Sequence, residues 1–300
     1  MVDPSLSHPA TAYPRRSRTN QNVLVIGASG RTGVEIIRHL AGHVSRPNIF
    51  AVRSSSSEQY DDLDLNMRKV CSEVIQADMR SSGDMEQAIL KCQPSTVIVS
   101  LADDVRCSSI EEYDGVAHTV GSHGADLART DLRYKNARIL VDILSRPEHQ
   151  HVHVVILSRI GAGPTKLHSR FGKAYLKQHQ LRFVMTDHTL QERAFLRSMK
   201  DRVIIIRPTE FTDAQESSGM MVQSFGDYDR PPTDKVNRTI FANWFVDQMC
   251  GGAWNTIDAY TSVLSPSGTL PAMKKRMAVD SCASFMYGKS INITGAHHRG

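Results

Sequence analysis

The feature that most constrains the fold is a glycine-rich turn between an apolar run and an amphipathic segment. The apolar run spans Val23 to Ile26 and leads directly into Gly-Ala-Ser-Gly-Arg-Thr-Gly at positions 27–33. Apolar residues then recur at helical spacing up to Gly42, namely Val34, Ile36, Ile37 and Leu40. A short strand, a tight turn and a helix are therefore expected in that order, as at the start of a βαβ unit.

Each glycine of the turn has a physical reason to be there. Gly27 permits a sharp turn out of the strand, Gly30 lets an anion approach the backbone without a Cβ in the way, and Gly33 allows the helix to pack closely on the strand. A helix start also presents backbone N–H groups to phosphate. The alternative is a plain turn into a helix, but a second strand that ends about 20 residues further on favours a dinucleotide site.

The same alternation of apolar runs and helical periods continues to about residue 250. Expected strands cover 49–52, 72–77, 95–101, 152–157 and 202–208, and expected helices cover 83–92, 125–144, 189–199 and 236–249. Residues 103–124 are read as a loop insertion, 289–293 as a late strand, and 251–284 show the weakest pattern. This order predicts an α/β fold of the Rossmann type, a doubly wound parallel sheet with a small C-terminal elaboration on the substrate side.

The domain organisation follows from the same pattern. Residues 1–22 are rich in Ser, Thr, Pro and Arg and are expected to form a disordered tail, with an organelle transit peptide as the alternative. One NAD(P)-binding domain is expected over residues 23–294, with the elaboration at about 209–288 and a short tail at 295–300.

Composition narrows the class of protein. With 40% hydrophobic and 22% charged residues the chain is expected to form a packed core. Its net charge of +5 is spread out, so it suits an anionic small molecule as well as nucleic acid, and we expect no nucleic-acid partner. The five cysteines are odd in number and widely spaced, which speaks against disulfides and a clustered zinc site. A cytoplasmic protein without a membrane segment is expected, as a monomer or homodimer that binds a small-molecule substrate.

The end of the second expected strand bears on the choice of cofactor. NAD-preferring sites usually carry an acidic residue there for the ribose 2′-OH, whereas this chain has Arg53. An arginine can hold a 2′-phosphate through its guanidinium fork, and Arg31 in the glycine turn can approach the same group. NADP(H) is therefore the expected cofactor, the alternative being two solvent-facing arginines that tolerate either nucleotide. The serines at 54–57 could add hydroxyl donors or form a flexible loop.

Several short motifs in order resemble one known family. Together with the glycine turn, Ala77-Asp78-Met79, Ser158 and Arg207-Pro208 resemble atypical short-chain dehydrogenases/reductases of the NmrA-like, NAD(P)-binding group over roughly residues 22–250. Within that group, the stretch 184–188 and the helix after it resemble the biliverdin-IXβ and flavin reductases.

The resemblance implies a set of site residues. Asp78 and Met79 would line the adenine, Leu101 and Ala102 would flank the ribose, and Ser158 and His188 would border the nicotinamide and the substrate as candidate catalytic residues. The expected cofactor-binding residues are Gly27, Ser29, Gly30, Arg31, Thr32, Gly33, Arg53, Asp78, Met79, Leu101, Ala102, Ser158 and Pro208.

Each candidate catalytic residue has a plainer interpretation. Ser158 could be an ordinary turn residue, and His188 could cap the following helix instead of donating a proton near neutral pH. His151 and His153 share one face of a strand, but without a third ligand nearby they are read as edge-strand histidines, so no metal is expected. The carboxylates Glu111, Glu112 and Asp114 are read as a solvated acidic loop.

The sequence departs from classical short-chain dehydrogenases in its catalytic tyrosine. A Tyr near 170 with a Lys four residues later would be needed for the usual tyrosinate route, but positions 170, 171 and 174 hold Arg, Phe and Ala. Tyr175 comes too late and is followed four residues later by His179, although Lys173, Tyr175 and Lys177 could form an irregular version. This departure also makes an epimerase or dehydratase of nucleotide sugars a weak alternative.

Two functions remain open at this point. The first is an NADP(H)-dependent oxidoreductase that transfers hydride to a small conjugated or carbonyl acceptor, which requires mainly that the nicotinamide be positioned against the acceptor. The alternative is a non-catalytic NADP(H)-binding regulator or assembly factor, because some proteins of this group bind the cofactor without a proton-donating tyrosine.

Overall fold

The computed structural model describes residues 21–54, 65–101, 131–163, 179–208, 211–213, 220–223, 236–250 and 289–295. Its centre is one eight-stranded sheet in the order β3-β2-β1-β4-β5-β6-β10-β8, and β7 and β9 form a separate pair. The strands are β1 (Asn22–Ile26), β2 (Asn48–Ser54), β3 (Glu73–Ala77), β4 (Thr96–Val99), β5 (His153–Leu157), β6 (Val203–Pro208), β7 (Phe211–Thr212), β8 (Met220–Gln223), β9 (Val236–Asn237) and β10 (Lys289–Gly295).

All neighbours in the large sheet are parallel except the edge pair of β10 and β8. The strand order reverses between β1 and β4, which is the switch point of a doubly wound sheet. The predicted Rossmann-type fold is therefore confirmed.

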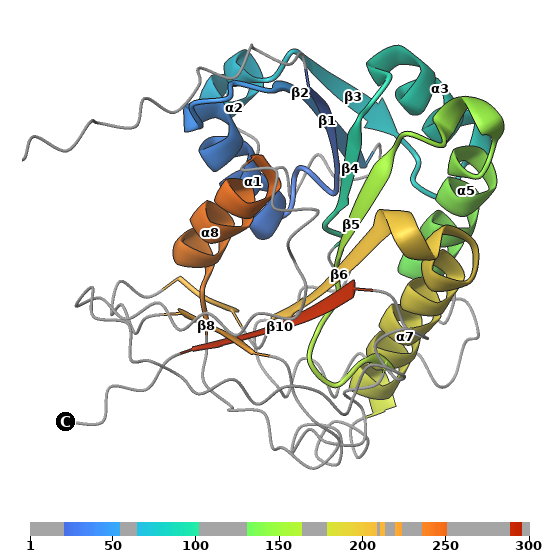
Figure 1. The fold of residues 1–300 in the computed structure, drawn as a ribbon, viewed down its shortest axis with the longest axis vertical. Helices are drawn as coiled ribbons and strands as arrows, with labels where there is room; N and C mark the ends of the chain where they lie inside the picture. The colour runs from blue at the N-terminus through green and yellow to red at the C-terminus, as the bar shows by residue number, and fades with distance from the viewer. Residues whose placement is uncertain are drawn as a thin grey trace, which may run out of the picture.

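Helices cover both faces of the sheet (Figure 1). One face carries α1 (Arg31–Gly42) and α8 (Arg238–Cys250), with α2 (Leu65–Val70) beside α1. The other face carries α3 (Ser82–Cys92), α5 (Leu132–Leu144) and α7 (His179–Met199).

Each face of the sheet has its own hydrophobic core, because successive side chains of a strand point to opposite sides. Along β1, Val23 and Val25 pack with the apolar stripe of α1 and the aromatic residues of α8, whereas Leu24 and Ile26 pack with α3, α5 and α7. The first core joins α1 to α8, so it fixes α8 next to the glycine turn.

The helices and the late strands differ from the expectations in several places. Helix α7 begins at His179 rather than near Thr189, and β10 runs on to Gly295. Helix α5 is described from Leu132, so its expected start at 125 lies outside the described residues. The short elements α2, β7, β8 and β9 were not expected.

The interpretation of the histidine pair as edge-strand residues is wrong. His153 begins β5, which lies inside the sheet between β4 and β6, and His151 lies in the turn before that strand. The acidic residues Glu111, Glu112 and Asp114 and the irregular Lys173, Tyr175 and Lys177 set lie outside the described residues.

Candidate functional site

The glycine turn is pressed between two strands, and this packing requires glycine at two positions. Gly27 has φ +84°, and a Cβ built there would lie 2.4 Å from the backbone O of Ser100. A Cβ on Gly33 would lie 2.3 Å from the O of Gly27. On the other side, the N–H groups of Gly27 and Ala28 donate to the O of Val52 at 3.2 and 3.0 Å. The structural reasons expected for Gly27 and Gly33 therefore hold.

The start of α1 carries no acidic or capping side chain of its own. Gly30 is the N-cap residue with φ −76° and ψ 151°, a conformation that any residue adopts, so its glycine is not needed for backbone geometry. No side chain caps this end through the N-cap residue, and the first turn carries no acidic residue. Since the first N–H groups of a helix have no partner within the helix, the end of α1 fits the diphosphate of a dinucleotide.

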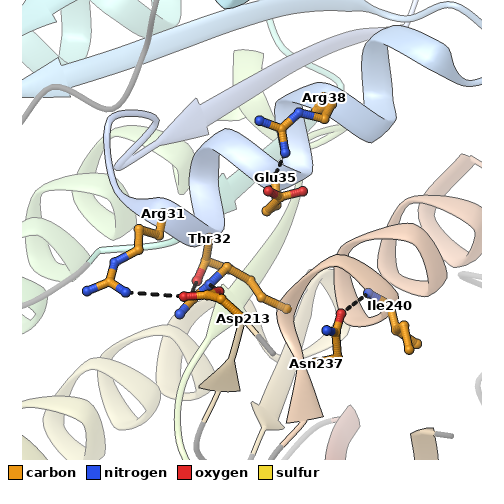
Figure 2. Close-up of polar contacts among 8 residues, drawn as sticks. Arg31, Thr32, Glu35, Arg38, Asp213, Asn237 and Ile240 are labelled. Atoms are coloured by element: carbon orange, nitrogen blue, oxygen red, sulfur yellow. Dashed lines mark hydrogen bonds and ion pairs between the residues drawn. The ribbon is translucent and has the colours of Figure 1, made fainter. Parts of the chain in front are cut away.

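Arg31 and Asp213 lie beside this helix start (Figure 2), and Arg238 bonds the same carboxylate. Arg31 Nη1 lies 3.2 Å from Asp213 Oδ2, and Arg238 Nε donates to Asp213 Oδ1 at 2.7 Å. Arg238 Nη1 also donates to Thr32 Oγ1 at 2.6 Å. The bonds from Arg238, with the further bond from Arg31, hold the pKa of Asp213 below its usual value although burial opposes this.

The expected adenine-side residues are held by local hydrogen bonds. Arg53 Nη2 donates to Gln76 Oε1 at 3.4 Å, so the Arg53 side chain points toward the neighbouring strand β3. It does not point toward Asp213, the carboxylate that Arg31 binds. The Asp78 N–H donates to Asp84 Oδ2, and the buried Met79 accepts at its O from Asn136 Nδ2 at 3.0 Å.

The remaining cofactor candidates lie at carboxyl ends of strands. Ser29 is almost fully buried in the turn, and Leu101 is buried after β4. Pro208 ends β6, where its O accepts from the N–H of Ile160 at 3.1 Å. Ala102 lies outside the described residues.

Ser158, after β5, belongs to a buried polar cluster. Its hydroxyl donates to Glu192 Oε1 at 2.5 Å, and its Oγ lies 3.5 Å from His188 Nδ1. Arg207 holds the same Glu192 carboxylate with two bonds, at 2.9 Å to Oε1 and 2.8 Å to Oε2. The side chains of Arg207 and Glu192 are only 1% and 2% exposed, so this is a fully buried ion pair.

His188 is neutral at neutral pH in this environment. Burial first, and then the positive charges of Arg133 and Arg159, hold its pKa well below the usual 6.5. It also lies in the middle of α7, so the interpretation of His188 as a helix cap is wrong. The neighbouring Asp187 is the residue that caps a helix: its carboxylate accepts from the N–H groups of Arg133 and Tyr134, at the start of α5.

Sequence reasoning brought together Ser158 and His188 but missed four residues. Glu192, Asp213 and Arg238 were not singled out, and Arg207 was noted only as a family motif. An arginine inside the otherwise apolar run 203–208 signals a buried partner, because an unpaired charge would be costly there. Asp213 and Arg238 lie far from the glycine turn in the sequence, and no local pattern joins them to it.

Metal-ion clusters and membrane-spanning helices are both absent from the part of the chain that the structure describes. No group of three or more His, Cys, Asp and Glu side chains there could hold a metal ion. No helix in the same ranges is long and apolar enough to cross a bilayer.

With this geometry in place, the fold and glycine turn define a nucleotide-binding protein of the Rossmann type. The chain belongs to the NAD(P)H-binding family, whose model matches residues 27–249. This confirms the expected membership of an NAD(P)-binding family. A search of curated protein sequences gave no match.

Solved structures of the same fold are similar to this chain at low sequence identity. A protein assigned as a NAD-dependent epimerase/dehydratase from Bacillus halodurans is 15% identical, with 91% of this chain and 94% of that one covered and a TM-score of 0.54. A short-chain dehydrogenase/reductase from Veillonella parvula, solved in complex with NADP, is 12% identical, with 92% and 95% covered and a TM-score of 0.52. A protein assigned as a NADH-flavin reductase from Streptococcus pneumoniae is 9% identical, with 91% and 98% covered and a TM-score of 0.52.

Proposed function

We propose that this protein is an NADP(H)-dependent oxidoreductase that transfers hydride to a small conjugated or carbonyl acceptor. The observation that carries the proposal is the start of α1 at the carboxyl end of β1, where Gly27 and Gly33 are required by packing and the first helical turn carries no acidic or capping side chain of its own. Membership of the NAD(P)H-binding family supports a nicotinamide dinucleotide as the ligand of this turn.

The preference for NADP(H) rests on the charge at the end of β2. Arg53 is the residue of this strand that an NAD-selective site would replace with an acid, and its guanidinium donates to Gln76 Oε1. A 2′-phosphate placed there meets a positive charge and bidentate donors.

When bound, the cofactor supplies the hydride. The chain's own part is to position the nucleotide. The amides at the start of α1 would hold the diphosphate, and Arg53 would hold the 2′-phosphate. Asp78, Met79 and Leu101 would line the adenosine. Ser158 would border the nicotinamide. Because His188 is neutral and buried, the proton that accompanies the hydride is proposed to come from solvent.

A non-catalytic NADP(H)-responsive regulator is the second candidate, and one observation favours it. Ser158 has a single O–H, and this group is donated to Glu192 inside a buried cluster rather than presented to a substrate. A protein that needs only to bind the nucleotide could keep such a cluster for stability.

Turnover separates the two candidates. Purified protein is mixed with NADPH and a panel of flavins, quinones and tetrapyrroles, and the loss of reduced-nicotinamide absorbance is followed. An oxidoreductase oxidises NADPH with at least one acceptor, and Ser158→Ala changes that rate while NADPH binding is kept. Binding of NADPH without oxidation across the panel supports the regulator, and no binding contradicts both.

A further inference from the structure

Arg31 and Arg238 are each the first residue of a helix, which is an unfavourable place for a positive charge. The helix macrodipole puts about half a positive charge at this end, where acidic residues normally stabilise the helix. The first turns of α1 and α8 contain no acidic residue. The carboxylate that both guanidinium groups bind is that of Asp213, just after β7. The same rule of helix stability is therefore broken at two helix starts that lie side by side, as is common at functional sites.

Arg238 is held firmly at the glycine turn. Helix α8 begins where it does because Asn237 Oδ1 accepts from the N–H of Ile240 at 3.0 Å (Figure 2). The Arg238 guanidinium then lies over the ring of Phe211, 4.9 Å from its centre, and bonds the hydroxyl of Thr32 in the first turn of α1. Its side chain is 13% exposed, whereas that of Arg31 is 62% exposed.

The charges of the described residues around Asp213 do not balance. The two guanidinium groups exceed the one carboxylate by a full positive charge, and the two helix starts add about half a charge each. The excess is close to the double negative charge of a nucleotide diphosphate. The Thr32 hydroxyl accepts its bond from Arg238, so its hydrogen can be donated to an oxygen of the same ligand.

We propose that Arg238 is a diphosphate-binding residue of the nucleotide site, and that Asp213 orients Arg238 and Arg31 until the diphosphate takes over their hydrogen bonds. This inference rests on the proposed nucleotide binding and deepens it, because it brings a residue of the C-terminal helix α8 to a site otherwise built by β1 and α1. The diphosphate replaces one carboxylate with more acceptor oxygens and one more negative charge, which the guanidinium forks bind better.

The test is calorimetric titration of the full-length protein with NADPH and with NADH. Arg238→Gln is expected to weaken both by about tenfold, because both share the diphosphate and a charge-assisted hydrogen bond is lost. Arg38→Gln is the matched control: Arg38 lies on the exposed side of α1, paired with Glu35 (Figure 2), and its loss should leave both affinities unchanged.

Two further variants keep the inference open to contradiction. Asp213→Asn is expected to tighten both nucleotides by about two- to fivefold, because a competing exposed charge is removed. Arg238→Lys keeps the charge but loses the guanidinium fork, so its affinity for both nucleotides should be intermediate. It replaces Arg238→Gln in the test if that variant does not fold.

Each outcome has one meaning. Wild-type protein that binds neither nucleotide overturns the proposed function and this inference together. Wild-type protein that binds both, with folded Arg238 variants of equal affinity, overturns only this inference. A loss of affinity confined to NADPH would assign Arg238 to the 2′-phosphate and overturn its diphosphate role. Weaker nucleotide binding by Asp213→Asn would overturn the proposal that the diphosphate takes over the hydrogen bonds of Asp213.

Discussion

The glycine turn after β1 and the polar cluster after β5 lie at the same edge of one sheet, but they use their polar groups in opposite ways. At the turn, Arg31 and Arg238 share the carboxylate of Asp213, which leaves an excess of positive charge among the described residues. After β5, Ser158 and Arg207 both bond Glu192, and this cluster is buried. We propose that the first region receives an anion, whereas the polar groups of the second bond one another within the core.

The largest expected effect concerns the buried ion pair. Glu192→Gln removes the charge that pairs with Arg207 and leaves a guanidinium buried without a counter-charge, which should lower the free energy of unfolding by about 3–5 kcal/mol. Chemical denaturation measures the loss. If the two regions are independent, the affinity for ADP, which contains only the adenosine and the diphosphate, stays within about twofold.

The matched control for this variant is a pair at the surface. Glu86→Gln breaks the half-exposed pair of Glu86 with Arg146 and should cost far less than Glu192→Gln, because solvent screens the pair. An equal cost for both variants would contradict the assignment of Glu192 and Arg207 to the stability of the core.

The next effect concerns the turn itself. Gly27→Ala forces a Cβ against the O of Ser100 at a φ that disfavours side chains, so a loss of about 3 kcal/mol in unfolding free energy is expected. Gly42→Ala, at the end of α1 with open space around its Cβ, should be neutral or stabilise by up to about 1 kcal/mol. Similar stabilities of these two variants in denaturant would show that the turn is not constrained as described.

Arg53→Glu should act on binding rather than on stability. The 2′-phosphate would lose a charge-assisted fork and meet a negative charge, so the affinity for NADPH should fall by about ten- to a hundredfold while that for NADH changes little. Titration of both cofactors measures the ratio. Equal losses would mean that Arg53 does not contact the 2′-phosphate.

The smallest expected effect is a change in how stability depends on pH. The unfolded chain binds a proton on His188 near pH 6.5, whereas the folded chain does so only at much lower pH. His188 therefore contributes to the stability of the folded protein in full above pH 6.5. This contribution falls by up to about 1.4 kcal/mol for each pH unit below 6.5. Denaturation of His188→Gln between pH 8 and 5 should give a shallower slope than wild type, and parallel slopes would contradict the buried neutral imidazole.

The same comparison explains what the sequence could predict. The glycine turn, the strands and the order of the sheet follow from local patterns, because apolar periodicity and turn residues involve only residues that are close in the sequence. The start of α7 was missed because the residues before Thr189 show no clear apolar period, although the helix runs from His179.

The side-chain partners were harder to predict than the elements. Glu192 meets Arg207 and Asp213 meets Arg31 only through the tertiary fold, which brings together residues far apart in the chain. One signal was available: Asn237 is a good N-cap before a helical period, so Arg238 falls at the first helical position, where a positive charge is unfavourable without an anion.

The most direct test of the central claim is amide NMR of the protein titrated with NADPH. If the diphosphate is held by the start of α1, the largest saturable chemical-shift changes fall on the N–H groups of Gly30, Arg31, Thr32 and Gly33. Saturable binding that leaves these four amides unmoved, or well-folded protein whose spectrum does not respond to NADPH, would contradict the account.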